Sequence, residues 1–74
     1  DYIWVYDNEP RSRQITDKIS RSIDAGDRVV IWPRSIRQKD LNDMVTSGIN
    51  VKSVIESNVY HGLKAKLQLS NWKI

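Results

Sequence analysis

The sequence has no cysteine, and it has a single histidine among its 74 residues. Disulfide bonds and thiolate-bound metals are therefore excluded within these residues, and His61 alone cannot supply a zinc site. No apolar run approaches the roughly 20 residues that a membrane-spanning helix needs, so we expect no membrane segment. Repeats, low-complexity stretches and flexible linkers are also missing. What remains is a short chain of globular composition, which is enough for one small domain or part of one.

The chain has only a small excess of positive charge. Lysine and arginine outnumber aspartate and glutamate by 12 to 9, which leaves a net charge of +3. An excess of this size is more often a solvated surface than a binding site, so it permits an anionic partner without identifying one. The chain begins inside a strand-forming run and without methionine. We therefore expect residues 1–74 to be a segment of a longer polypeptide.

Two short runs have the composition of buried strands. Residues 2–6 (YIWVY) and 28–32 (RVVIW) are almost continuously apolar and rich in β-branched and aromatic residues, which is typical of parallel strands buried on both faces. Turn-forming residues before Pro10 end the first run, and Pro33 ends the second, because proline cannot donate to a sheet ladder. The sequence predicts a strand at each run.

An amphipathic helix is predicted between the two strands. Isoleucine recurs at every fourth residue from Ile15 to Ile23, and polar residues fill the other faces of residues 12–25. Ser12 has the chemistry of an N-cap, and Gly26 suits the left-handed position after a helix. A strand, a helix and a strand in this order predict a right-handed βαβ unit with parallel strands, so the fold class is α/β.

Two short helices and a less regular tail are predicted in the C-terminal half. The first helix has Asp40 as its N-cap and Asp43 in capping-box position, and it ends at Gly48. Asn50 caps a second helix with an apolar stripe. In residues 63–69 (LKAKLQL) apolar and polar residues alternate, which favours a half-exposed edge strand, although a helical turn also fits. We expect a strand there.

Four carboxylates are expected near one edge of the sheet. Asp7 and Glu9 follow the first strand, and the loop after the second strand leads to Asp40 and Asp43. The C-terminal ends of parallel strands open onto one edge, so these side chains can converge there. Magnesium takes oxygen ligands of this kind. The pattern also fits a plainer reading, in which Asp7 and Glu9 form a turn and Asp40 and Asp43 cap a helix.

Basic and aromatic residues add candidates for nucleic-acid contact. Arginine and lysine side chains near this edge can hold phosphates beside a metal, or they can form a solvated rim. These residues are Arg11, Arg13, Arg34, Arg37 and Lys39. Trp4 and Trp32 lie within the predicted strands and are expected in the core, whereas Trp72 or Tyr60 can stack on a base if exposed.

Four segments of the chain, WVYDNEPR, AGDRVVIWP, KDLNDM and GLKAKLQLSNWKI, carry a family resemblance. In their order and spacing, they closely resemble the C-terminal end of DNA primases of T-even-type bacteriophages. This resemblance implies a Toprim-like catalytic domain, in which a glutamate on an earlier strand and an Asp-x-Asp pair hold magnesium. Asp7 and Glu9 match that pair, with Glu9 replacing the second aspartate. Lys39, Asp40 and Asp43 match a segment that contacts metal or nucleotide.

The function implied by this resemblance is synthesis of short RNA primers on single-stranded DNA by magnesium-dependent nucleotidyl transfer. Residues 1–74 would form the C-terminal half of the catalytic domain and be inactive alone, since the earlier glutamate and a zinc module are not among them. Ribonucleoside triphosphates, a DNA template, a replicative helicase and the cytoplasm of the infected host are implied as substrates, partners and location. The implied catalytic residues are Asp7 and Glu9; the implied metal ligands are Asp7, Glu9, Asp40 and Asp43; the implied nucleotide contacts are Arg11, Arg34, Arg37 and Lys39.

Other functions fit parts of the same pattern. A Toprim nuclease or topoisomerase would share the metal edge but cleave DNA. A non-catalytic module would bind nucleic acid or protein through its basic face, with carboxylates that only cap and turn. A receiver-type domain phosphorylated on Asp7 is a further reading that the short chain disfavours. Metal dependence separates the catalytic readings from the interaction module.

Overall fold

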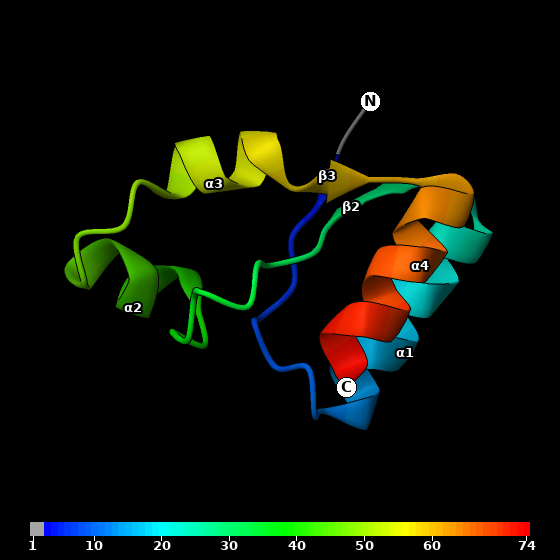
Figure 1. Ribbon diagram of the computed structural model, residues 1–74, viewed down its shortest axis with the longest axis horizontal. Helices are drawn as coiled ribbons and strands as arrows, with labels where there is room; N and C mark the ends of the chain where they lie inside the picture. The colour runs from blue at the N-terminus through cyan, green and yellow to red at the C-terminus, as the bar shows by residue number, and fades with distance from the viewer. Residues whose placement is uncertain (1–2) are drawn as a thin grey trace.

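A computed structural model describes residues 3–74 of the chain as a small α/β domain (Figure 1). The described part contains a three-stranded sheet and four helices. In chain order, the elements are β1 (Ile3–Trp4), α1 (Arg13–Asp24), β2 (Arg28–Val30), α2 (Leu41–Thr46), α3 (Val51–Ser57), β3 (Val59–Tyr60) and α4 (Gly62–Lys73).

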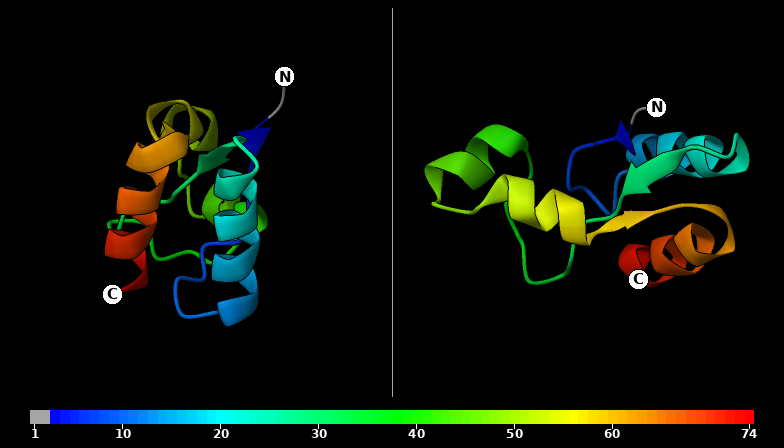
Figure 2. Two further views of the ribbon diagram at one scale, coloured as in Figure 1. Left: turned by 90° about the vertical axis from the view of Figure 1, so that its right-hand side faces the viewer. Right: turned by 90° about the horizontal axis from the view of Figure 1, so that it is seen from above.

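The sheet is mixed, with strand order β1-β2-β3. β1 and β2 are parallel, with Trp4 opposite Val29, and β3 pairs with β2 in the antiparallel direction. The predicted βαβ unit is therefore confirmed as a parallel pair joined through α1. Helices α1 and α4 pack side by side, whereas α2 and α3 lie at the other end of the molecule (Figures 1 and 2).

The first predicted strand is shorter and more exposed than the sequence suggested. Within the described residues β1 covers only Ile3–Trp4, and Tyr2 lies outside them. Trp4 is 38% exposed and Val5 is 36% exposed, so the prediction of burial on both faces, and of Trp4 in the core, was wrong. The physical reason is that β1 is an edge strand. Trp4 instead stacks on Tyr6, with ring centroids 5.9 Å apart, and its Nε1 donates to Asp27 at 2.9 Å.

The tail is a helix, so the predicted strand over residues 63–69 was wrong. α4 buries Ala65, Leu69 and Trp72, which follow one another at the spacing of a helical face, and it exposes Leu63 and Leu67. An alternating pattern with leucine or alanine at every second position contains both this face and a strand face. Packing against α1, which the tail sequence does not reveal, selects the helix. The strand in this region is the short β3, which the sequence reading missed.

The predicted helix caps are confirmed. The Ser12 side chain accepts a hydrogen bond from the backbone N–H of Ile15 at the start of α1, and Asp40 Oδ1 accepts one from Asp43 at the start of α2. Asn50 likewise caps α3. Gly48, with φ of 83°, ends the α2 turn in the left-handed region that glycine adopts without steric cost.

The core joins β2 to helices from both halves of the chain. Val29, Val30 and the two residues that follow β2 are buried, so the second apolar run, including Trp32, is buried as predicted. The remaining buried apolar side chains are Ile19, Ile23, Met44, Ala65, Leu69 and Trp72. None of the four helices is long and apolar enough to cross a membrane within residues 3–74.

One buried polar side chain, Asn8, connects three segments of this fold. Its Nδ2 donates to the carbonyl oxygens of Ile36 at 2.8 Å and Gln38 at 3.0 Å, and its Oδ1 accepts from the indole of Trp72 at 3.3 Å. Its backbone N–H also donates to the Lys39 carbonyl at 2.6 Å. The loop after β1, the loop after β2 and the end of α4 are thus held together by one residue.

We predict that Asn8→Ala lowers the free energy of unfolding by about 2–4 kcal/mol, because each buried group left without a partner costs about 1–3 kcal/mol. Urea denaturation followed by tryptophan fluorescence would measure this. The matched control is Asn42→Ala, since Asn42 is exposed on α2 and its side chain makes no hydrogen bond to another residue of 3–74. It should change stability by no more than about 0.5 kcal/mol. Equal stability of the two variants would show that the Asn8 contacts are not structural.

Candidate functional site

Asp7 and Glu9 lie on the loop after β1, on either side of the buried Asn8. Asp7 is exposed and Glu9 is half-buried. Glu9 Oε1 lies 3.7 Å from the Nζ of Lys39, which precedes α2. An ion pair this exposed contributes at most about 1 kcal/mol to stability. It does show that the segments carrying Glu9 and Lys39 lie close together. The structure brings the β1 loop beside the loop that leads into α2.

Asp40 and Asp43 lie at the start of α2 rather than in a shared cluster with Asp7 and Glu9. One oxygen of Asp40 is engaged in the helix cap, and Asp43 is exposed in the first turn. Within residues 3–74, no three histidine, cysteine or acidic side chains gather in a group that would hold a metal. The plainer reading of Asp40 as a helix cap is therefore confirmed, and a metal role for the four carboxylates stays a prediction.

The donor chemistry of Asp7 and Glu9 nevertheless suits magnesium. This ion is usually held by one or two protein carboxylates, with water and substrate phosphates as the other ligands. An exposed carboxylate beside a half-buried one, on one short loop, provides such a pair. Magnesium binding by Asp7 and Glu9 stays a prediction.

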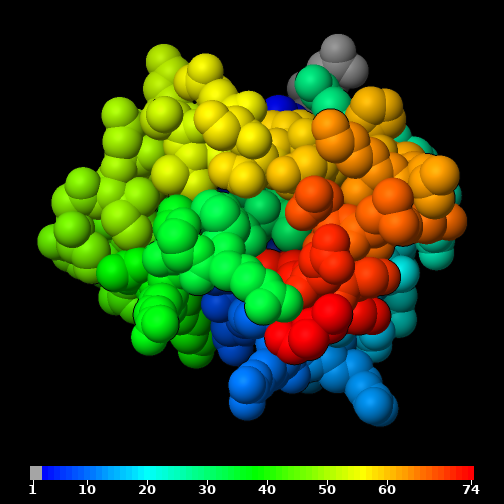
Figure 3. Space-filling view, in the orientation of Figure 1, coloured from blue at the N-terminus to red at the C-terminus, as the bar shows by residue number. Residues whose placement is uncertain are grey.

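Three of the predicted basic residues line one pocket, which we call the arginine pocket. It has a volume of about 290 Å³, and no carboxylate side chain lines it. Its lining residues are Asn8, Pro10, Arg11, Pro33, Arg34, Ile36, Arg37, Trp72 and Ile74. Figure 3 shows the loop after β1 in blue, the loop after β2 in green and the end of α4 in red meeting on one face. The convergence expected for Arg11, Arg34 and Arg37 is thus observed.

The arginines differ in what holds them. The Arg34 guanidinium donates to the backbone carbonyl of Asn71 at 2.6 Å, where it satisfies an oxygen in the last turn of α4. Arg11 and Arg37 are exposed and make no hydrogen bond or ion pair with another residue of the described chain. Arg13 is exposed on α1 outside this pocket, and Lys39 pairs with Glu9. The lining of this pocket therefore holds three arginines and no aspartate or glutamate.

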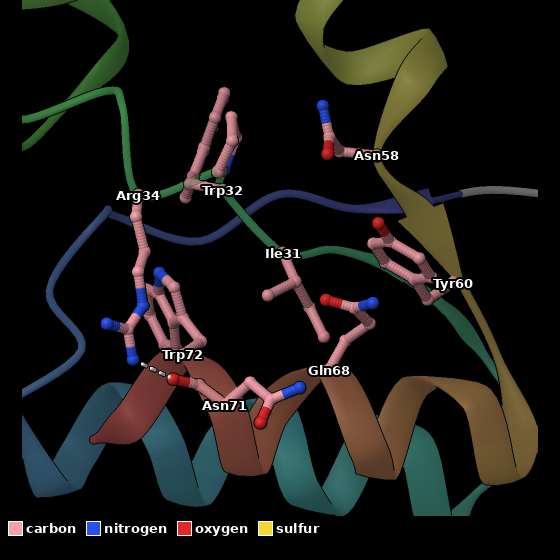
Figure 4. A pocket seen from close by; sticks show the side chains of 9 residues that line it. Ile31, Trp32, Arg34, Asn58, Tyr60, Gln68, Asn71 and Trp72 are labelled. Carbon is pink, nitrogen blue, oxygen red and sulfur yellow. Dashed lines mark hydrogen bonds between the residues drawn. The ribbon is translucent and has the colours of Figure 1, made fainter.

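A second pocket adjoins the first, and sequence reasoning missed it. This amide pocket, as we call it, has a volume of about 320 Å³ and shares Pro33, Arg34 and Trp72 with the arginine pocket (Figure 4). Its other lining residues are Ile31, Trp32, Asn58, Tyr60, Gln68 and Asn71. The only sequence signal for this pocket is the three-residue spacing of Gln68 and Asn71, which puts both amides on one face of a helix. Because a strand was predicted there, that signal was missed.

The structure also shows where the aromatic side chains proposed for the core or for base stacking lie. Trp72 is 5% exposed and donates to Asn8, so the exposure on which its stacking on a base depended is not found. Trp32 is buried, and its indole donates to the Tyr6 carbonyl at 2.8 Å. Tyr60 is half-buried and lines the amide pocket, so its contact with a base stays a prediction.

Comparison with known proteins agrees with the resemblance seen in the sequence. No family model matches the chain. A DNA primase of Enterobacteria phage T4 is 37% identical to it over an alignment of 75 positions, which covers 95% of this chain and 22% of that protein. The chain thus spans about a fifth of the length of this curated relative. With this identity over nearly its whole length, the chain is a counterpart of one segment of a phage DNA primase.

Proposed function

We propose that this chain contributes the phosphate-binding side of the nucleotidyl-transfer site in a primase that synthesises RNA primers on single-stranded DNA. The observation that carries the proposal is the pocket lined by Arg11, Arg34 and Arg37, with no acidic side chain in its lining, beside the loop that bears Asp7 and Glu9. In a relative of a DNA primase, this arrangement suits the triphosphate of a ribonucleotide and the backbone of a template.

The arginines have the chemistry for this task. A guanidinium is planar, stays charged at any working pH and offers paired N–H donors to phosphate oxygens. Arg34 is anchored on α4 and provides a fixed contact, whereas Arg11 and Arg37 can adjust to the ligand. The chain itself therefore binds and orients phosphates.

Asp7 and Glu9 would hold magnesium in this proposal, with Asp40 and Asp43 as candidates for a second set of ligands. When bound, magnesium neutralises phosphate charge and stabilises the attacking and leaving oxygens of the transfer. Lys39 balances the charge of Glu9 when no cation is near. These contacts support a division of the edge into a cation-binding loop and an anion-binding pocket.

The complete catalytic domain would be Toprim-like, because a parallel strand pair followed by carboxylates is the part of that fold that this chain resembles. Since the chain covers 22% of its relative, primer synthesis belongs to the whole protein. A replicative helicase as partner, and action in the cytoplasm of the infected cell, are parts of the same proposal.

A magnesium titration followed by amide NMR tests the cation-binding loop. We expect shifts in residues 7–11 and 39–43 and, for Asp7→Asn, binding weaker by at least about tenfold, since even the loss of outer partners of metal ligands costs 10–100-fold. The control is Asp17→Asn, which removes the same charge from an exposed position on α1. Amide signals that do not shift with magnesium, or an equal loss of magnesium affinity in the two variants, would favour the non-catalytic interaction module.

A salt titration tests the arginine pocket. We expect Arg37→Gln to weaken binding of single-stranded DNA and to reduce the slope of log K against log salt by about 0.7 for each phosphate that the arginine neutralises. Fluorescence anisotropy at several salt concentrations measures both. Arg13→Gln is the matched control, because Arg13 is exposed but outside the pocket. Identical slopes for the two variants would contradict a specific role of the pocket.

A further inference from the structure

The amide pocket carries polar groups that the fold does not use. The side-chain amides of Gln68 and Asn71 and the hydroxyl of Tyr60 make no hydrogen bond to any other residue of 3–74. Asn58 donates its Nδ2 to the Val54 carbonyl at 2.8 Å, and its Oδ1 has no partner within the same range. Donors and acceptors are therefore both available around one hollow.

The walls of this pocket are apolar and rigid. Ile31 and Trp32 are both 3% exposed, and the Trp32 indole is held by its hydrogen bond to Tyr6. In Figure 4, Gln68 and Asn71 extend from α4 on one side of the hollow, while Trp32 and Asn58 lie on the other and Tyr60 beside them. A volume of about 320 Å³ is at the lower end of the range of roughly 300–1,000 Å³ for small-molecule sites.

This combination selects for a flat ring with a polar edge. Side-chain amides donate and accept at once and so pair with the edges of nucleobases. Tyr60, which is half-buried, is the aromatic side chain of the lining that can contact a ring, since Trp32 and Trp72 are only 3% and 5% exposed. A purely apolar ligand would leave the amides without partners, which costs affinity. A simple anion would contact Arg34 but would leave the amides unpaired.

Arg34 connects the two pockets. It lines both of them, and its hydrogen bond to the Asn71 carbonyl at 2.6 Å fixes the guanidinium at their boundary (Figure 4). A ligand with its ring in the amide pocket can thus place an attached anionic group on Arg34 and, beyond it, on Arg37. A nucleotide has this arrangement of a ring and a phosphate.

We infer that the amide pocket binds the base of a nucleotide whose phosphate lies on Arg34 in the arginine pocket. The identification of the ligand as a nucleotide rests on the proposed primase function, but the inference is independent of the metal. A free ribonucleoside triphosphate and a nucleotide within single-stranded DNA share this chemistry, and the experiment separates them.

The test is an NMR titration of the isotopically labelled chain in EDTA, so that magnesium contributes nothing. The ligands are the four ribonucleoside triphosphates, inorganic tripolyphosphate and a set of single-stranded DNA trinucleotides. We expect nucleotides to shift the side-chain amide signals of Asn58, Gln68 and Asn71, and tripolyphosphate to shift only signals of the arginine pocket. Tighter binding of trinucleotides than of triphosphates would assign the pocket to the template, and the reverse order to the incoming nucleotide; both support the inference.

Variants on α4 sharpen the test. Gln68→Leu keeps the size of the side chain and should weaken nucleotide binding by about tenfold while leaving tripolyphosphate binding unchanged. Asn71→Ala, at an exposed position, is the second variant in case the first alters the fold, which the dispersion of the amide spectrum reports. Ser70→Ala is the control, because Ser70 is exposed on the same helix outside the pocket.

Equal affinities for tripolyphosphate and nucleotides, with unmoved side-chain amide signals, would overturn the inference. So would equal behaviour of Gln68→Leu, Asn71→Ala and Ser70→Ala. Because the titration in EDTA contains no magnesium, its outcome does not depend on Asp7 or Glu9 as metal ligands. The nucleotide titration in EDTA tests the base pocket, and the magnesium titration with Asp7→Asn tests the metal-dependent function. A failure of either hypothesis can therefore be distinguished from a failure of the other.

Discussion

The candidate site depends on the burial of a single amide, that of Asn8. A buried amide is stable only when its donors and acceptor find partners, and Asn8 finds them on the loop after β2 and on Trp72. With Asn8 directed inwards, its exposed neighbour Asp7 faces solvent and Glu9 comes within reach of Lys39. The position of the carboxylates thus follows from a residue that need not touch any ligand.

The same network explains why the two pockets adjoin. Trp72 closes the end of α4 against Asn8 and lines both pockets, and Arg34 holds the last turn of that helix through the Asn71 carbonyl. Docking of α4 against α1 and the loops therefore creates the walls on which the basic and amide side chains stand. Positive charge collects on one side of this junction, while the carboxylates stay on the β1 loop beyond Lys39.

Under the proposed function, this layout separates three tasks in space. Carboxylates on an exposed loop suit a cation, arginines in a shallow pocket suit phosphates, and neutral amides beside Tyr60 suit a base. The three regions meet around residues 33–40, which form the loop between β2 and α2. A nucleotide bound there would be oriented by side chains from both ends of the sequence.

Local physics was readable from the sequence alone. Ser12, Asp40 and Asn50 form caps with their own neighbours, and the isoleucines of α1 and the apolar run of β2 mark their buried faces. The rule that parallel strands end at one edge predicted that the loops after β1 and β2 meet, as the Glu9–Lys39 pair shows, but the expected convergence of four carboxylates is not seen within residues 3–74. Tertiary structure alone decided that the alternating tail is helical, that Trp4 is exposed and that Asn8, Gln68 and Asn71 define the pockets. Those outcomes depend on contacts between residues far apart in the chain, such as Asn8 with Trp72, for which no local spacing carries a signal.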